Sequence, residues 1–158
     1  MMDIERMQSN ASNSLQSDCN FTCGRYDTVA DDREEAQVQA AIKVVLVVDD
    51  NEESAQTMAD MLERDGYQVR IAYDVAQTLT IIKTNLFDAA VLDIGLPDGT
   101  GFELAEQIRQ LGWGRHARLI AHTGWSTPED QQRSMDAGFD HHLAKPLDYA
   151  ALLALLQA

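Results

Sequence analysis

From about residue 43 onward, short apolar runs alternate with longer segments in which apolar residues recur every three or four positions. An unbroken apolar, β-branched run such as Val44–Val48 is typical of a strand buried on both faces, as in parallel sheets. The longer segments are typical of amphipathic helices. The pattern therefore predicts five strands, over Lys43–Val48, Tyr67–Ala72, Phe87–Asp93, Ala117–Thr123 and Phe139–Ala144.

Helices are predicted between these strands, because capping residues stand at the ends of the amphipathic segments. Asp74 and either Ser126 or Thr127 can cap helix starts, and Gly66 and Gly138 follow helix ends. The five predicted helices cover Glu52–Asp65, Asp74–Thr84, the segment from the turn at Leu96–Gly99 to about Leu111, residues 128–137, and Asp148–Gln157.

Strands that alternate with helices predict an α/β fold, a doubly wound five-stranded parallel sheet with helices on both faces. Right-handed crossovers leave few topologies, and we expect the flavodoxin-like strand order 2-1-3-4-5. Tyr67–Ala72 is expected to be a half-exposed strand and a candidate edge of the sheet.

The first 41 residues have a different composition, rich in Ser, Asn, Gln and acidic residues. Such a segment buries too little apolar surface to offset its ordering entropy, so a disordered tail over residues 1–41 and a folded domain over residues 42–158 are predicted. A short helix over Asp31–Ile42 is an open alternative within that region. Cys19 and Cys23 also lie there and are interpreted as free thiols.

The net charge of −14 narrows the classes of partner. It disfavours non-specific nucleic-acid binding, which needs basic patches, and it disfavours anionic membrane surfaces. The sequence shows neither a long apolar span nor a signal peptide, so a cytoplasmic protein is expected.

Charged residues follow three of the predicted strands. Asp49 and Asp50 follow the first, Asp93 ends the third, and Lys145 follows the fifth. The carboxyl ends of parallel strands are where open α/β sheets bind ligands. Three carboxylates and one ammonium converging there predict a site for a divalent cation and an anionic group.

This combination suits phosphoryl transfer to an aspartate. A carboxylate can accept a phosphoryl group as an acyl phosphate when cations neutralise the charge of both partners. Asp49 and Asp50 can hold Mg²⁺, and Asp93 can contribute another oxygen and act as the nucleophile. Lys145 and the hydroxyl of Thr123 can bind phosphoryl oxygens. Phosphoryl transfer needs mostly positioning and charge neutralisation, and these residues can supply both.

Four motifs carry a resemblance to a known family, over about residues 43–157. In their order and spacing they resemble the receiver domain of two-component response regulators. The residues within the motifs are similar to those of receivers in hybrid sensor kinases. The motifs are Val44–Glu52, Val91–Gly101, Ala121–Gly124 and Ala144–Pro146.

The resemblance implies roles for these residues. Asp93 is implied to be the phosphoacceptor, and Asp49, Asp50, Asp93 and the backbone carbonyl of Gly95 are implied to bind Mg²⁺. Thr123 and Lys145 are implied to contact the phosphoryl group, and the Lys145–Pro146 bond is implied to be cis.

One position departs from the family pattern. Receivers usually carry Tyr or Phe three positions before the lysine, as a rotating switch residue, whereas this chain has His142. Imidazole is flat but polar and titratable, so the coupling between Thr123 and His142 is expected to differ from the usual one. His122, His141 and His142 lack the spacing of a metal motif and are interpreted as hydrogen-bonded or surface residues.

We expect a phosphoacceptor without an attached output domain and without turnover of an external substrate. Its implied donor is a sensor histidine kinase or a histidine phosphotransfer protein, and its output is an unknown downstream protein. A monomer or weak dimer is expected, and the Leu-rich end of the chain is a candidate contact surface. Two alternatives stay open: a phosphatase with an aspartyl nucleophile, and an inactive receiver that acts as a binding module.

Overall fold

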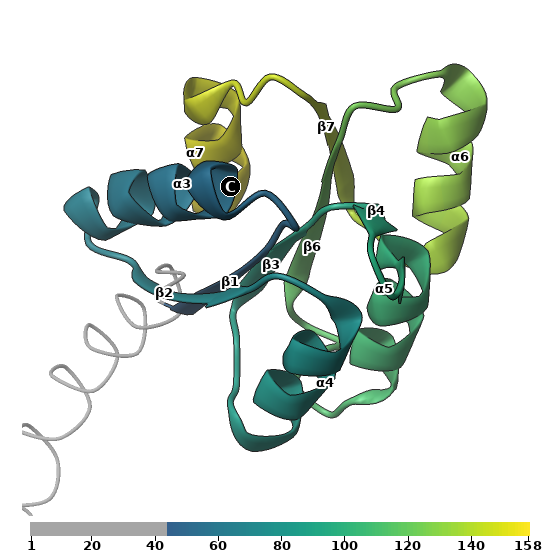
Figure 1. Ribbon diagram of the computed structural model, residues 1–158, viewed down its shortest axis with the longest axis horizontal. Helices are drawn as coiled ribbons and strands as arrows, with labels where there is room; N and C mark the ends of the chain where they lie inside the picture. The colour runs from purple at the N-terminus through teal and green to yellow at the C-terminus, as the bar shows by residue number, and fades with distance from the viewer. Residues whose placement is uncertain (1–43) are drawn as a thin grey trace, which may run out of the picture. The chain divides into compact units, whose positions relative to one another are not determined.

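Five parallel strands form the central sheet of the computed structural model, which describes residues 44–158 (Figure 1). Their spatial order is β2-β1-β3-β6-β7, which is the predicted order 2-1-3-4-5 for the five strands taken along the chain. The strands are β1 (Val44–Val48), β2 (Gln68–Ala72), β3 (Ala89–Leu92), β6 (Arg118–Thr123) and β7 (His141–Ala144). The predicted tail, the possible helix over Asp31–Ile42, Lys43 and both cysteines lie outside the described residues.

Helices cover both faces of the sheet, as predicted. Figure 1 shows α3 and α7 on one face and α4, α5 and α6 on the other. Within residues 44–158 no helix is long and apolar enough to cross a membrane. The helices are α3 (Glu52–Arg64), α4 (Val75–Thr84), α5 (Gly101–Gln110), α6 (Pro128–Ala137) and α7 (Tyr149–Gln157).

The alternation of side chains along each strand divides the core into two layers. In β1, Val45 and Val47 pack toward α3 and α7, whereas Leu46 and Val48 pack toward α4 and α5. All four residues of β3 are buried, while β2 and β7 are partly exposed because they form the two edges. The half-exposed second strand is therefore an edge strand, as predicted.

Most helix ends are capped by the residues that the sequence indicated. Asp74 accepts a hydrogen bond from the Gln77 amide at 2.6 Å, and Thr127 caps α6 with Pro128 in its first turn. Gly138 ends α6 with a φ of 105°, a backbone conformation that residues with a Cβ rarely adopt.

The loop after β3 is more ordered than the predicted turn. It forms a small antiparallel hairpin of β4 (Gly95–Leu96) and β5 (Gly99–Thr100). The carboxylate of Asp98 accepts hydrogen bonds from the amides of Val75 (2.8 Å) and Ala76 (3.0 Å), at the start of α4. These bonds satisfy two of the free amides at that helix end, and they hold the loop that follows Asp93 against α4.

Gly101 places the start of α5 directly against the backbone that carries Asp93. A Cβ at this position would lie 2.4 Å from the Asp93 carbonyl oxygen and 2.9 Å from the Cα of Ile94. The Gly101 amide also donates a 2.9 Å hydrogen bond to the carbonyl of Ile94. The close approach of these two backbones therefore requires glycine.

We predict that Gly101→Ala lowers the free energy of unfolding by about 1–3 kcal/mol, because the added methyl group must push α5 away from Asp93. Gly112→Ala is the matched control, since a Cβ there meets nothing within 4 Å. Urea unfolding monitored by circular dichroism measures both. Equal stability of the two variants would show that the backbone at Asp93 yields without cost.

Candidate phosphoryl-accepting site

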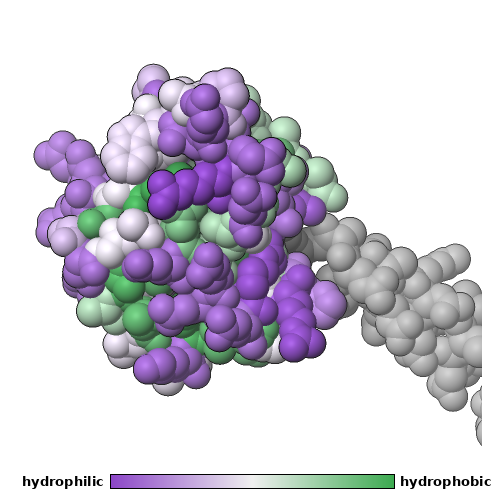
Figure 2. Space-filling model, turned by 90° about the vertical axis from the view of Figure 1, so that its right-hand side faces the viewer, coloured by the Kyte–Doolittle hydropathy of each residue, from purple (hydrophilic) through white to green (hydrophobic). Residues whose placement is uncertain are grey.

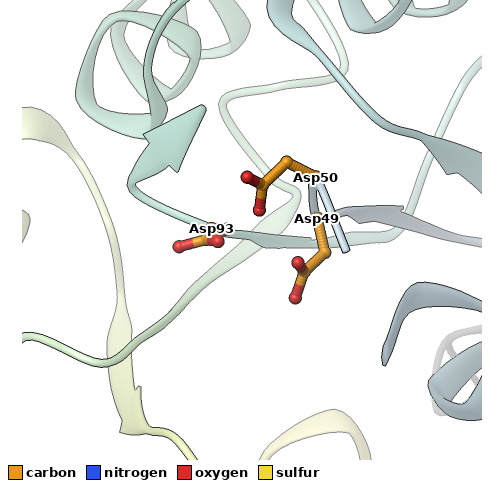
Figure 3. A group of neighbouring side chains, drawn as sticks. All are labelled: Asp49, Asp50 and Asp93. Carbon is orange, nitrogen blue, oxygen red and sulfur yellow. The ribbon is translucent and has the colours of Figure 1, made fainter. Parts of the chain in front are cut away.

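Three carboxylates meet at the carboxyl ends of β1 and β3, which are neighbours in the sheet. One oxygen from each of Asp49, Asp50 and Asp93 lies within 4.8 Å of the others, and Figure 3 shows the three side chains around a common space. Asp49 and Asp93 are buried and Asp50 is exposed. The structure thus brings together residues that are more than forty positions apart in the sequence, as the predicted topology requires.

Asp49 is held in place by two hydrogen bonds from the start of α3. Its Oδ1 accepts a hydrogen bond from the Asn51 amide at 2.9 Å, and its Oδ2 accepts one from the Ser54 hydroxyl at 3.2 Å. Asn51 and Ser54 belong to the first turn of α3, where Asn51 is the cap. The turn that starts α3 therefore fixes the orientation of this carboxylate.

The ammonium of Lys145 lies between the two buried carboxylates. Its Nζ is 2.9 Å from Oδ2 of Asp93 and 3.0 Å from Oδ2 of Asp49. Burial alone would lower the pKa of Lys145, but the hydrogen bonds to Asp93 and Asp49 outweigh burial and raise it. Lys145 is therefore a permanent cation of this site.

Asp93 is in a less polar environment than an ordinary surface aspartate. Burial raises its pKa and the negative charge of Asp49 adds to the rise, while the hydrogen bond from Lys145 opposes it. Its Oδ1 also accepts a 3.3 Å hydrogen bond from the Gly95 amide. A raised pKa indicates a more basic and more nucleophilic carboxylate than usual.

Thr123 ends β6, and Lys145 follows β7, the two strands on the other side of Asp93 in the sheet. Thr123 is buried at the end of β6, and its carbonyl accepts a 2.9 Å hydrogen bond from the Lys145 amide. Its Oγ1 accepts a hydrogen bond from the Trp125 amide at 3.2 Å. The bond between Lys145 and Pro146 is cis, as the resemblance implied.

His142 lies on β7, outside the carboxylate cluster. Its Nε2 is 3.0 Å from the carbonyl oxygen of Trp125, and its Nδ1 is 3.2 Å from Oγ of Ser134. The sequence indicates neither partner, because one is a backbone carbonyl and the other, Ser134, is fully buried on α6. The interpretation of His142 as a hydrogen-bonded residue is confirmed.

His122 contradicts that same interpretation. The ring is buried beside the site on β6, and its Nε2 has no hydrogen-bond partner among the described residues. Burial lowers its pKa to about 4, and the positive charge of Lys145 contributes to the shift. The pattern of β6 could have indicated burial, because His122 shares a face of the strand with the core residue Ile120.

We predict that His122→Leu raises the free energy of unfolding at neutral pH by about 1–3 kcal/mol, because it removes an unsatisfied buried nitrogen. The folded-state pKa of about 4 lies below the ordinary 6.5, so the unfolded chain binds the proton first and acid destabilises the unmodified protein. The free energy of unfolding of His122→Leu should therefore exceed that of the unmodified chain by about 2 kcal/mol more at about pH 5 than at about pH 7.

Urea unfolding at the two pH values measures this advantage. His116→Leu serves as the control, because it makes the same substitution at an exposed histidine. If His122→Leu and the unmodified chain lost stability in parallel, His122 would have a partner in solution.

Comparison with known proteins agrees with this geometry. The sequence model of the response regulator receiver domain matches residues 45–157. An uncharacterized 14.6 kDa protein of Leptolyngbya boryana is 34% identical over 113 residues, which are 72% of this chain and 86% of that protein. The sensor histidine kinase RcsC of Escherichia coli is 34% identical over 104 residues, 66% of this chain, and the match spans 11% of the kinase.

Solved structures give the same result. A response regulator of Burkholderia pseudomallei, determined with a phosphorylated aspartic acid, a calcium ion and citrate, is 33% identical with a TM-score of 0.68. The match covers 73% of this chain and 67% of that structure. With the sheet order, the motif positions and these relatives in agreement, the chain belongs to the response regulator receiver domain family.

Proposed function

We propose that this chain is a phospho-accepting receiver in which Asp93 takes a phosphoryl group from a phosphohistidine. The observation that carries the proposal is the placement of Lys145, whose ammonium bonds Asp93 at 2.9 Å and Asp49 at 3.0 Å within the carboxylate cluster. The proposed receiver domain comprises residues 42–158. The roles proposed for Asp49, Asp50 and Thr123 rest on their positions around Asp93 and Lys145.

The donor set fits a divalent cation of the Mg²⁺ type. Mg²⁺ prefers hard oxygen ligands and is usually bound by one or two carboxylates together with water and phosphate oxygens. Asp50 and Asp93, with Asp49 directly or through water, would hold the ion, and the carbonyl of Gly95 would complete the protein ligands. When bound, the ion neutralises charge on the carboxylates and on the phosphoryl oxygens.

The transfer moves a phosphoryl group from nitrogen to oxygen. A carboxylate oxygen of Asp93 attacks the phosphorus atom, the P–O bond to Asp93 forms, and the P–N bond to the donor histidine breaks. The electron pair of the P–N bond returns to the imidazole, whose other ring nitrogen carries a proton, so the donor leaves as neutral histidine. Lys145 and the Thr123 hydroxyl bind oxygens of the transferred group, so that the added charge is neutralised where it arrives.

The family and its relatives support the proposed partners. The donor would be a sensor histidine kinase or a histidine phosphotransfer protein, and the output would be contact with a downstream protein in a two-component phosphorelay. The net charge of −14 argues against a nucleic-acid or membrane partner. We propose a cytoplasmic location and a monomer or weak dimer.

A phosphatase fits less well, because the residue two positions after Asp93 is Gly95, which supplies no general acid.

The first prediction for this function concerns the modified residue. A small-molecule phosphodonor with Mg²⁺ should add the mass of one phosphoryl group to the full chain, and Asp93→Asn should abolish that addition. Asp98→Asn is the control, because Asp98 lies in the same loop but bonds the start of α4. Intact-protein mass spectrometry measures the addition. Equal labelling of the two variants would overturn the assignment of Asp93.

The second prediction concerns the cation. Mg²⁺ at about ten times its dissociation constant should stabilise the chain by about 1.4 kcal/mol, because it binds the folded state alone. Asp50→Asn should lose most of this gain, whereas Asp136→Asn, an exposed change on α6, should keep it. Thermal unfolding with and without Mg²⁺ tests this. The same gain in both variants would place the ion elsewhere.

A further inference from the structure

Asp49 is a buried carboxylate that depends on protein groups for its hydrogen bonds. Its side chain is 2% exposed, whereas the hydrophilic side chains that predominate on the side of the molecule shown in Figure 2 have access to water. A buried carboxylate without donors is strongly destabilising, because it has lost its hydration. In the described part of the chain, the donors that reach Asp49 are the Asn51 amide, the Ser54 hydroxyl and the Lys145 ammonium.

Two of these donors share one oxygen of Asp49. The Asn51 amide bonds Oδ1, while Oδ2 lies 3.2 Å from Oγ of Ser54 and 3.0 Å from Nζ of Lys145. An ionised carboxylate only accepts hydrogen bonds, so the Ser54 hydroxyl must donate its hydrogen to Oδ2. The same ammonium also bonds Asp93 at 2.9 Å. Oδ2 of Asp49 therefore shares its cation with the proposed phosphoacceptor, while its bond to Ser54 is its own.

The contact between Ser54 and Asp49 serves the site and not the helix. The Ser54 amide donates to the side chain of Asn51 at 3.0 Å, which fixes the residue in the first turn of α3. A serine within a helix often bonds a carbonyl of the preceding turn, but this hydroxyl bonds a carboxylate that lies before the helix begins. Alanine has a higher helix propensity than serine, so α3 itself gains nothing from serine at this position.

The proposed function makes a demand on Lys145 that Ser54 can help to meet. A phosphoryl group on Asp93 brings new anionic oxygens, and the ammonium that neutralises them has only three N–H groups. As Lys145 turns toward one of these oxygens, its bond to Asp49 weakens. The buried Oδ2 of Asp49 then retains the Ser54 hydroxyl as its donor.

We propose that Ser54 is a positioning residue, whose hydroxyl keeps Asp49 bonded and in place while Lys145 turns from Asp49 to the phosphoryl group. The inference rests on the proposed function. The Ser54 hydroxyl contributes more in the phosphoryl-bound state than in the free state, because Lys145 bonds Oδ2 of Asp49 fully only in the free state. Removal of the hydroxyl therefore weakens binding of the phosphoryl group more than binding of the cation.

The test compares two dissociation constants of the full chain. The first is for beryllofluoride, a mimic of the phosphoryl group, at saturating Mg²⁺, followed by the amide chemical shift of Gly95, which bonds Asp93. Ser54→Ala should raise it about tenfold, because a hydrogen bond to a charged group is lost in the bound state. The second, for Mg²⁺ alone, comes from thermal unfolding and should change by less than about threefold, since Lys145 still bonds Asp49.

Ser54→Thr keeps the hydroxyl and should bind beryllofluoride within about threefold of the unmodified chain. Thr57→Ala is the matched control, because it removes an exposed hydroxyl further along α3 and should leave both constants unchanged. These two variants separate loss of the Ser54 hydroxyl from a general effect of substitutions in α3.

A rise of less than about threefold for beryllofluoride in Ser54→Ala would overturn the inference and leave the proposed function standing. An equal rise for Mg²⁺ alone would also overturn it, because Ser54 would then serve the cation. An equal rise in Ser54→Thr would do the same, because the hydroxyl would not be responsible. If beryllofluoride did not bind even the unmodified chain, the proposed function itself would fail.

Discussion

The structure of the site depends on the contact of one ammonium with two buried carboxylates. Two like charges about 4 Å apart near a protein surface repel by about 4 kcal/mol, and here three carboxylates have oxygens within 4.8 Å of one another. Lys145 offsets this repulsion because it bonds Asp49 and Asp93 at once. One cation does not balance three anions, and the remaining negative charge suits the divalent ion that we propose for this cluster.

That contact requires an accurate arrangement of the backbone around it, which the sheet and its loops supply. Parallel pairing in register places Val48 beside Leu92, so the residues that follow them, Asp49 and Asp93, are adjacent. Gly101 lets α5 begin against the carbonyl of Asp93, and Asp98 binds the same loop to the start of α4. Asp93 is therefore held by the backbone on both sides, which reduces the reorganisation that the proposed phosphoryl transfer requires.

The sequence predicted the sheet order and the residues that the structure brings together at its carboxyl edge, because both follow from local patterns and one topological rule. An apolar run ends at Asp49, another ends at Asp93, and parallel strands align their ends. Contacts that depend on side-chain direction were not predictable in this way. The bonds from Asp98 to α4 and from His142 to Ser134 join positions whose partners appear only once loops and helices are placed. His122 was misread because polarity suggested a partner, whereas its place in the strand alternation indicated the core.

The same comparison separates what the family shares from what this chain changes. The charged residues that we propose accept and neutralise a phosphoryl group meet a strict electrostatic requirement, because Lys145 bonds Asp49 and Asp93 at once. His142 differs from the aromatic ring that is usual at its position, because both of its ring nitrogens lie within hydrogen-bond distance of a partner, the Trp125 carbonyl and the Ser134 hydroxyl. Hydrogen bonds are directional and short in range, so these two contacts define the orientation of the imidazole more closely than packing alone defines that of an apolar ring.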